Sequence, residues 1–240
     1  VLVEGDQETY AFMIEAKRSK PEKYKWIVPH PGGWHIMMHV GKGLLLRYYG
    51  AGVESVAQLL GGDDKHAAAG DNYRRTHHLL TVTFEAMWCI VFELFDLWRA
   101  GGGRAGGAEV DVVQWLRRRG ETHQTLRLWI PFLLEDYPSY FAFRMGGRSG
   151  NYPLCVAALR TLAPIFAATG KTNYISLCME HLTNLARMPP KDLETIGTIF
   201  ASSFSRKPYT KVFGDEHQEM CNRISKSALT RAVMSFFKKV

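Results

Sequence analysis

The stretch WIVPHPGGWHIMMH, residues 26–39, decides the fold around which the rest of the chain is arranged. Its first three residues form an apolar, β-prone run that stops at Pro29, and a Pro-Gly-Gly turn follows at residues 31–33. Trp34 and His35 then open an apolar segment with helical spacing. This order of strand, turn and helix predicts that His35 lies at the carboxyl end of a strand, where open α/β sheets bind their ligands.

The beginning of the chain shows a related pattern. Residues 1–3 (VLV) are an apolar run that ends in Glu-Gly-Asp, and residues 9–20 have the spacing of a helix. The first 35 residues therefore predict a β-α-β unit, with neighbouring parallel strands at residues 1–3 and 26–28. In this unit Asp6 and His35 would occupy equivalent strand ends.

The remainder of the chain predicts an α/β protein that is predominantly helical. Residues 1–50 would form the β-α-β part with its following helix, residues 51–205 an α-helical insertion, and residues 206–240 a strand and a closing helix. Residues 137–144 look turn-like, and Gly146 to Gly150 read as a break. The periodicity predicts a helical core around Phe84, Trp88, Phe92, Phe95, Trp129, Phe132, Leu162 and Phe166.

Composition narrows the class of protein. The 240 residues are 46% hydrophobic, which is enough for a real core and argues against disorder. The net charge of +7 is compatible with a nucleic-acid partner and equally with an ordinary basic surface. Four separated cysteines indicate reduced thiols, and hence a nuclear or cytoplasmic protein without a zinc site. The apolar run at residues 79–98 contains three acids, so we expect a buried helix and no membrane span.

Two acids and one histidine are candidates for chemistry. Asp6 follows a strand end, where a carboxylate suits Mg²⁺, although a solvated turn acid has the same sequence. Glu219 would lie one turn into a helix that Asp215 caps, near the positive end that keeps a carboxylate ionised, or it could simply pair with Arg223. His35 could orient a carboxylate or a phosphate, or be a satisfied core residue.

Three segments carry a resemblance: VLVEGDQETY, KWIVPHPGGWHIMMH and DEHQEM…NR…K. Together they resemble a family of uncharacterised eukaryotic domains that look transposon-derived. The arrangement is also similar to the C-terminal part of an RNase H-like DDE transposase, with its helical insertion before a final Glu helix. The resemblance covers most of the chain and is weakest between residues 61 and 135.

The resemblance implies a site. Carried over, Asp6 would be the second acid, Glu219 the final Glu and His35 the histidine of the element that follows the next strand. Asp6 and Glu219 would then be metal ligands for Mg²⁺ or Mn²⁺. Position 32, where relatives carry Cys or Asp, is Gly. The first Asp and three strands would lie upstream of Val1, so this chain alone is not expected to cut DNA.

The expected function is metal-dependent DNA strand cleavage and transfer in the full-length protein. The alternative is a domesticated, catalytically inactive DNA- or protein-binding module, and a third interpretation is a purely helical scaffold. DNA is the expected partner, and a homo-oligomer is compatible with the sequence. The basic residues expected to contact phosphates are Arg74, Arg75, Arg117, Arg118, Arg119, Arg223 and Lys226.

Overall fold

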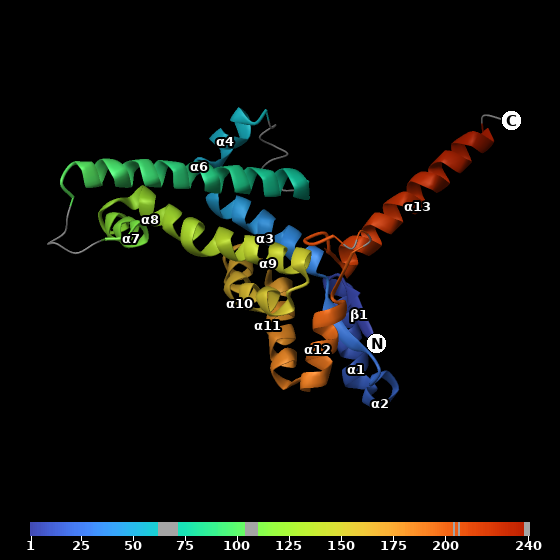
Figure 1. Cartoon of the computed structure of the whole chain (residues 1–240). Coiled ribbons are helices and arrows are strands. Elements are labelled where there is room, and N and C mark those ends of the chain that lie inside the picture. The colour runs from blue at the N-terminus through green and yellow to red at the C-terminus, as the bar shows by residue number, and fades with distance from the viewer. Residues whose placement is uncertain (62–71, 104–109, 204, 206, 238–240) are drawn as a thin grey trace. The chain divides into compact units, whose positions relative to one another are not determined.

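The computed structural model describes residues 1–61, 72–103, 110–203, 205 and 207–237, and this part of the chain is predominantly helical (Figure 1). The first helices are α1 (Gln7–Ser19), α2 (Pro21–Tyr24), α3 (Gly33–Tyr48), α4 (Val53–Leu59) and α6 (Tyr73–Ala100). The later ones are α7 (Val112–Thr122), α8 (Gln124–Pro131), the π-helix η1 (Phe132–Asp136), α9 (Tyr137–Ser149), α10 (Tyr152–Ala168), α11 (Thr172–Arg187), α12 (Pro190–Ile199) and α13 (Gly214–Phe237). The strands are β1 (Leu2–Gly5), β2 (Val28–Pro31), β3 (Ala201–Ser202) and β4 (Val212–Phe213).

Strands β1 and β2 pair in parallel, with Leu2 opposite Val28 and Gly5 opposite Pro31. Helix α1 and the short α2 connect them. The predicted parallel pair is therefore confirmed, although β2 begins two residues later than the apolar run at residues 26–28. This pairing excludes the purely helical scaffold.

The prediction that the second strand stops at Pro29 is wrong, because β2 includes both Pro29 and Pro31. The backbone N–H of Val28 donates to the carbonyl of Val1, the residue before β1, at 2.8 Å, and that of Gly32 donates to the carbonyl of Gly5 in β1 at 2.6 Å. Backbone N–H groups along a strand point alternately to its two edges, and those of Val28 and Gly32 point to β1. The nitrogens of Pro29 and Pro31 therefore point to the opposite edge of β2. A proline is tolerated there because that edge needs no N–H to pair with β1.

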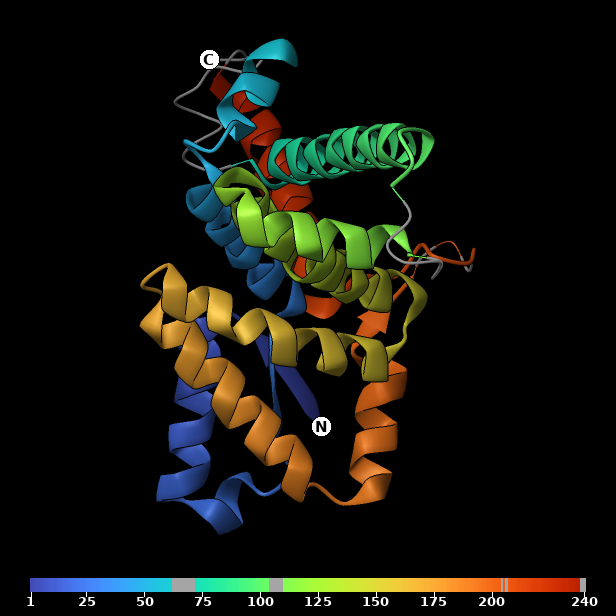
Figure 2. The same ribbon diagram turned by 90° about the vertical axis from the view of Figure 1, so that its left-hand side faces the viewer.

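The chain divides into two compact units. Unit 1 comprises residues 1–38, 142–163 and 171–240 and contains both strand pairs. Helix α1 packs against β1, β2 and α11, and α13 contacts β1 and the β3–β4 pair (Figure 2). The buried side chains of unit 1 include Tyr10, Ile36, Met37, Tyr152, Leu159, Leu162, Cys178, Phe200 and Phe213.

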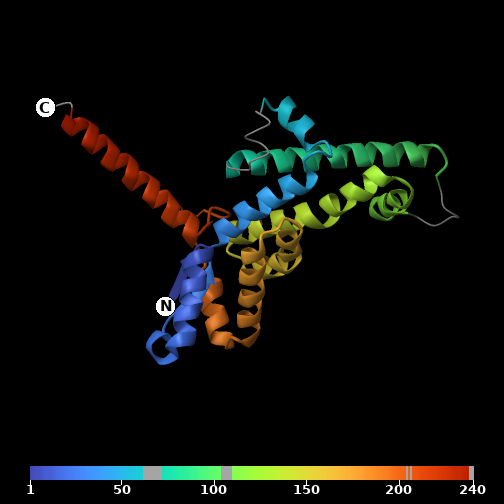
Figure 3. The ribbon, with the colours of Figure 1, turned by 180° about the vertical axis from the view of Figure 1, so that it is seen from behind.

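Unit 2 comprises residues 39–141 and 164–170, and its described elements are all helices. Helices α4 and α7 pack against α6, and α7 packs against α8 (Figure 3). The buried side chains of unit 2 include Leu44, Leu45, Tyr48, Leu80, Leu116, Trp129, Phe132, Tyr140 and Phe166. These units describe packing, and the predicted domain boundaries at residues 50/51 and 205/206 stay predictions.

Helix α6 is only partly covered. Phe95 is buried and Phe84 and Trp88 are half-buried, but Phe92 is 51% exposed, so its predicted place in the core is wrong. A wide aromatic face predicts burial without saying which side neighbouring helices will cover. By length and composition alone α6 could cross a membrane, and the core helix of a soluble protein passes the same test.

The predicted turn at residues 137–144 is wrong, because α9 runs from Tyr137 to Ser149. The glycine break predicted from Gly146 to Gly150 occurs only at Gly150, whose φ is 76°. The glycines at positions 146 and 147 allow close packing. A Cβ added to Gly146 would overlap Cys155 Sγ, and a Cβ added to Gly147 would lie 2.5 Å from the ring of Phe213. Pro138 follows the π-helix η1 in one continuous helical run, so its missing N–H falls where the hydrogen-bond pattern changes from π to α.

The short β3–β4 pair brings Phe213 into the core of unit 1. Ala201 pairs with Phe213 in antiparallel fashion, so the end of the predicted α-helical insertion at residues 51–205 contains a strand. The Phe213 ring stacks on Phe143 with centroids 5.4 Å apart. Gly33, at the start of α3, faces the same ring, and a Cβ there would overlap it. This packing positions the first turn of α3 beside the start of α13.

Candidate functional site

Asp6 and His35 lie just beyond the carboxyl ends of β1 and β2. Asp6 follows β1 directly and is the N-cap of α1, where its Oδ1 accepts a hydrogen bond of 2.9 Å from Thr9 N–H. His35 lies in the first turn of α3, which follows β2. The register places Gly5 opposite Pro31, so the turns that carry the two side chains start at the same edge of the sheet. Asp6 is exposed and His35 is half-buried.

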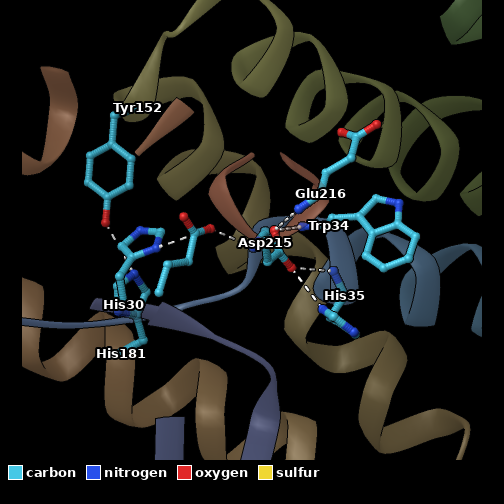
Figure 4. A network of polar contacts seen from close by, with 9 residues as sticks. His30, Trp34, His35, Tyr152, His181, Asp215 and Glu216 are labelled. Atoms are coloured by element: carbon cyan, nitrogen blue, oxygen red, sulfur yellow. Dashed lines mark hydrogen bonds and ion pairs between the residues drawn. The ribbon is translucent and has the colours of Figure 1, made fainter. Parts of the chain in front are cut away.

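Asp215 holds His35 in place from the far end of the chain (Figure 4). Its Oδ2 lies 2.8 Å from His35 Nδ1 and accepts from His35 N–H at 3.0 Å. Its Oδ1 accepts from the N–H groups of Trp34 and Glu216, both at 3.0 Å. The sequence predicts that Asp215 caps its own helix, but α13 begins at Gly214, so Asp215 lies inside its first turn. Its side chain instead caps the first turn of α3.

A second carboxylate completes this turn. Glu4 of β1 accepts from the N–H of Gly33 through Oε1, at 3.3 Å. The first three N–H groups of α3 are therefore bound by Glu4 and Asp215, whose side chains are 10% and 4% exposed. Because buried carboxylates need hydrogen-bond donors, the start of α3 and these two acids stabilise one another.

The electrostatics of the site favour a cationic His35. The hydrogen bond to Asp215 raises the pKa of His35, burial opposes this, and the charges of Asp215, Asp6 and Glu219 raise it further. The hydrogen bond from the Thr9 backbone is the main cause that lowers the pKa of Asp6. The imidazole of His35 therefore lies among three carboxylates that belong to both ends of the chain.

Glu219 lies on α13, one turn beyond Asp215. Its Oε1 is 3.2 Å from Arg223 Nε, which is the ion pair that the sequence offered as the alternative to a metal ligand. The side chains are 35% and 70% exposed, so this pair contributes little to stability. The ion pair leaves carboxylate lone pairs for other partners. The roles of Asp6 and Glu219 as metal ligands stay predictions.

Among the described residues, no group of three or more His, Cys, Asp or Glu side chains is arranged to hold a metal ion. The predicted phosphate contacts are all exposed, and they belong to both units. Arg74 and Arg75 lie on α6, Arg117, Arg118 and Arg119 on α7, and Arg223 and Lys226 on α13.

A buried polar cluster beside the site escaped the sequence analysis. His30 of β2 lies 3.7 Å from Glu4 through Nδ1, and neither of its ring nitrogens has a hydrogen-bond partner. The ring of His181 is 5.1 Å from that of His30, and its Nε2 is 3.1 Å from the hydroxyl of Tyr152 (Figure 4). The only local signal was a histidine between two strand prolines.

Comparison with protein-family models, with curated proteins and with solved structures gave no match to this chain, so its site is interpreted from its own geometry.

Proposed function

We propose that this chain is the C-terminal part of an RNase H-like domain derived from a transposase, and that the full-length protein uses Mg²⁺ or Mn²⁺ to cut and join DNA strands. One observation carries the proposal: Asp215, one turn before Glu219 on α13, lies 2.8 Å from His35 Nδ1, at the sheet edge where Asp6 follows β1. The parallel β1–β2 pair, with α1 between its strands, supports it, because such a pair presents loop residues at one edge.

The side chains at this edge suit a hard divalent cation. Mg²⁺ takes one or two carboxylates and keeps several waters, and the lowered pKa of Asp6 keeps its carboxylate ionised at neutral pH. Two carboxylates fall short of the clamp that a two-metal site needs. A further acid from elsewhere in the full-length protein is therefore part of the proposal.

In this proposal a divalent ion supplies Lewis-acid activation of the phosphoryl group for in-line attack. Asp6 and Glu219 provide the negative charge that binds the ion. His35 donates its Nδ1–H to Asp215, so the opposite ring nitrogen is directed to an anion such as a backbone phosphate. Arg223 and Lys226 follow Glu219 on α13 and contact neighbouring phosphates.

The test is a Mn²⁺ titration of the full-length protein and its Asp6→Asn and Glu219→Gln variants. Each substitution should weaken Mn²⁺ binding about tenfold or more, which corresponds to roughly 1.4 kcal/mol. Glu194→Gln, an exposed acid on α12, is the matched control and should bind as the wild type does. Equal Mn²⁺ affinity in all four proteins would remove the metal ligands from the proposal.

A second candidate is the catalytically inactive DNA-binding module, which one observation favours. A groove of about 510 Å³ in unit 1 runs past the outer edge of β2. Its lining includes four cationic side chains, Lys17, Arg18, Lys25 and Arg187, against the acids Glu180 and Asp192. Arg18 pairs with Glu180, Lys25 pairs with Glu22, and Lys17 donates to the carbonyl of Ile27. Arg187 is therefore the cation of this lining that we expect to meet a phosphate backbone first.

The two candidates differ in their dependence on metal. Binding of duplex DNA that persists in EDTA, weakens with salt and falls in Arg187→Ala would favour the module, provided that no strand cleavage accompanies it. DNA cleavage that requires Mn²⁺ and is lost in Glu219→Gln would favour the nuclease.

A further inference from the structure

The space beside Gly32 is filled by a side chain from the other end of the chain. A Cβ added to Gly32 would overlap Asp215 Oδ2 and would lie 2.8 Å from Asp215 Cγ. The same atom would lie 2.9 Å from the carbonyl oxygen of Gly5. The carboxylate of Asp215 thus occupies the position into which a short side chain at residue 32 would project.

The contacts of Asp215 exceed what a helix cap needs. A cap binds backbone N–H groups, and Asp215 binds those of Trp34 and His35. It also binds the imidazole of His35 through Nδ1, which sets the ring orientation and leaves the second nitrogen to face outward. The Asp215 side chain is 4% exposed, so its geometry is fixed by these donors and by the packing around it.

We propose that Asp215 is the positioning residue of this site, and that it does from α13 what an acidic side chain at position 32 would do locally. This inference rests on the proposed function in one respect: the proposed function explains why the orientation of His35 matters. Asp215 keeps a proton on Nδ1 of His35 in both the neutral and the cationic form of the imidazole, and it joins the start of α13 to the start of α3. Glu219, one turn further along α13, is thereby held at a constant distance from His35.

If the inference is right, a carboxylate beside His35 Nδ1 positions the imidazole whether residue 215 or residue 32 carries it. In Gly32→Asp combined with Asp215→Ala, the new carboxylate enters the space that the old one leaves. The approach to the Gly5 carbonyl, 2.9 Å in the present backbone, requires a small shift, so the recovery will be partial. In Gly32→Ala the new methyl group displaces the Asp215 carboxylate although Asp215 itself is retained.

The experiment is proton NMR of the full chain with ¹⁵N-labelled histidine, without metal or DNA. The wild type should show a protected His35 Nδ1–H resonance, which should be lost in Asp215→Asn and Asp215→Ala, and lost or weakened in Gly32→Ala. It should return in Gly32→Asp/Asp215→Ala. Gly197→Ala is the matched control, because its Cβ meets only an ordinary contact at 3.7 Å, and its spectrum should match the wild type.

Persistence of the resonance in Asp215→Asn would overturn the inference, as would a double variant that folds without the resonance or does not fold at all. If Asp215→Ala alone fails to fold, the double variant and Gly32→Ala still decide the question. The outcome is independent of Mn²⁺ affinity. Failure of the metal-binding experiment therefore leaves this test intact, and failure here leaves the metal ligands untouched.

Discussion

His181 of α11 is buried beside two other polar side chains of unit 1. Burial is the main cause that holds its pKa well below the ordinary value of 6.5, and the nearby His30 lowers it further. A histidine with a depressed pKa in the folded state stabilises the fold above its unfolded pKa, and this contribution is lost as the pH falls below that value. His35 acts in the opposite sense, because its pKa is raised.

The first prediction concerns this acid-sensitive contribution. The unfolding free energy of the wild type should fall between pH 7.5 and pH 5.5, and His181 should account for about 1.4 kcal/mol of this fall, because pH 5.5 is about one unit below its unfolded pKa. His181→Gln should lack this part of the fall. Urea unfolding of the wild type and the variant at both pH values measures it. The contribution of His35 is the same in both proteins and cancels.

His78→Gln provides the matched control for this comparison. His78 is exposed on α6, so its replacement should leave the slope of stability against pH unchanged. If the unfolding free energy of His181→Gln depends on pH as that of the wild type does, His181 makes no acid-sensitive contribution to stability.

The second prediction concerns Gly147, which faces the ring of Phe213. Gly147→Ala should destabilise the protein by about 1–3 kcal/mol, because the new methyl group lies 2.5 Å from the ring carbon Cζ. Phe213→Leu lacks the ring carbons that the methyl group meets. The double variant should therefore be more stable than the sum of the single changes predicts, by about 1 kcal/mol. Strict additivity in urea unfolding would contradict this packing.

Local contacts of a residue can be predicted from the sequence, whereas contacts between distant residues cannot. Asp6 and Thr9 are three positions apart, and a cap between them follows from a local pattern. The contact of Asp215 with the first turn of α3 joins residues 180 positions apart, and no local pattern contains it. The sequence supported the weaker, local reading, in which Asp215 caps only its own helix.

At the scale of elements, helix α6 shows that apolar residues at helical spacing are not all buried. Leu80 is fully buried on this helix, whereas Phe92 is 51% exposed. The third prediction is that Leu80→Ala costs about 2–5 kcal/mol of unfolding free energy, while Phe92→Ala costs less than about 1 kcal/mol. Chemical denaturation of the two variants compares them on one helix. A larger loss for Phe92→Ala would mean that its ring is covered in solution.

Most elements could be predicted, because apolar periodicity and start signals are local. Helix α1 and strand β1 begin and end within two residues of their predicted bounds, and α6 contains the whole apolar run at residues 79–98 that predicts it. Helix α9 could not be predicted, because Gly146 and Gly147 suit a turn as well as close packing, and only the tertiary neighbours decide. Strand β4 lies within residues 206–240, where the sequence predicts a strand, whereas β3 has only two residues and leaves no period of its own.

At the scale of the whole molecule, three helices belong to both units. Three of the four unit boundaries fall within continuous helices, α3, α9 and α10, and the fourth, at residues 170/171, lies between α10 and α11. Because a helix that melts in one unit leaves unsatisfied backbone groups at the boundary, we expect the units to unfold cooperatively.

The fourth prediction follows from this continuity. Leu80→Ala, a change in the core of unit 2, should lower the hydrogen-exchange protection of the Val28 and Gly32 amides, which lie in unit 1. Native-state hydrogen exchange by NMR measures it, with Phe92→Ala as the control that should change little. Unaltered protection of these two amides in Leu80→Ala would show that the units open independently.

The prolines of β2 have a consequence for how the molecule behaves in crowded solution. An exposed strand edge with a full row of N–H groups recruits further strands and seeds aggregates. Pro29 and Pro31 remove the N–H groups from the outer edge of β2, so a foreign strand arriving there finds no donors. The two prolines therefore disfavour the addition of a further strand at the side of β2 that faces away from β1.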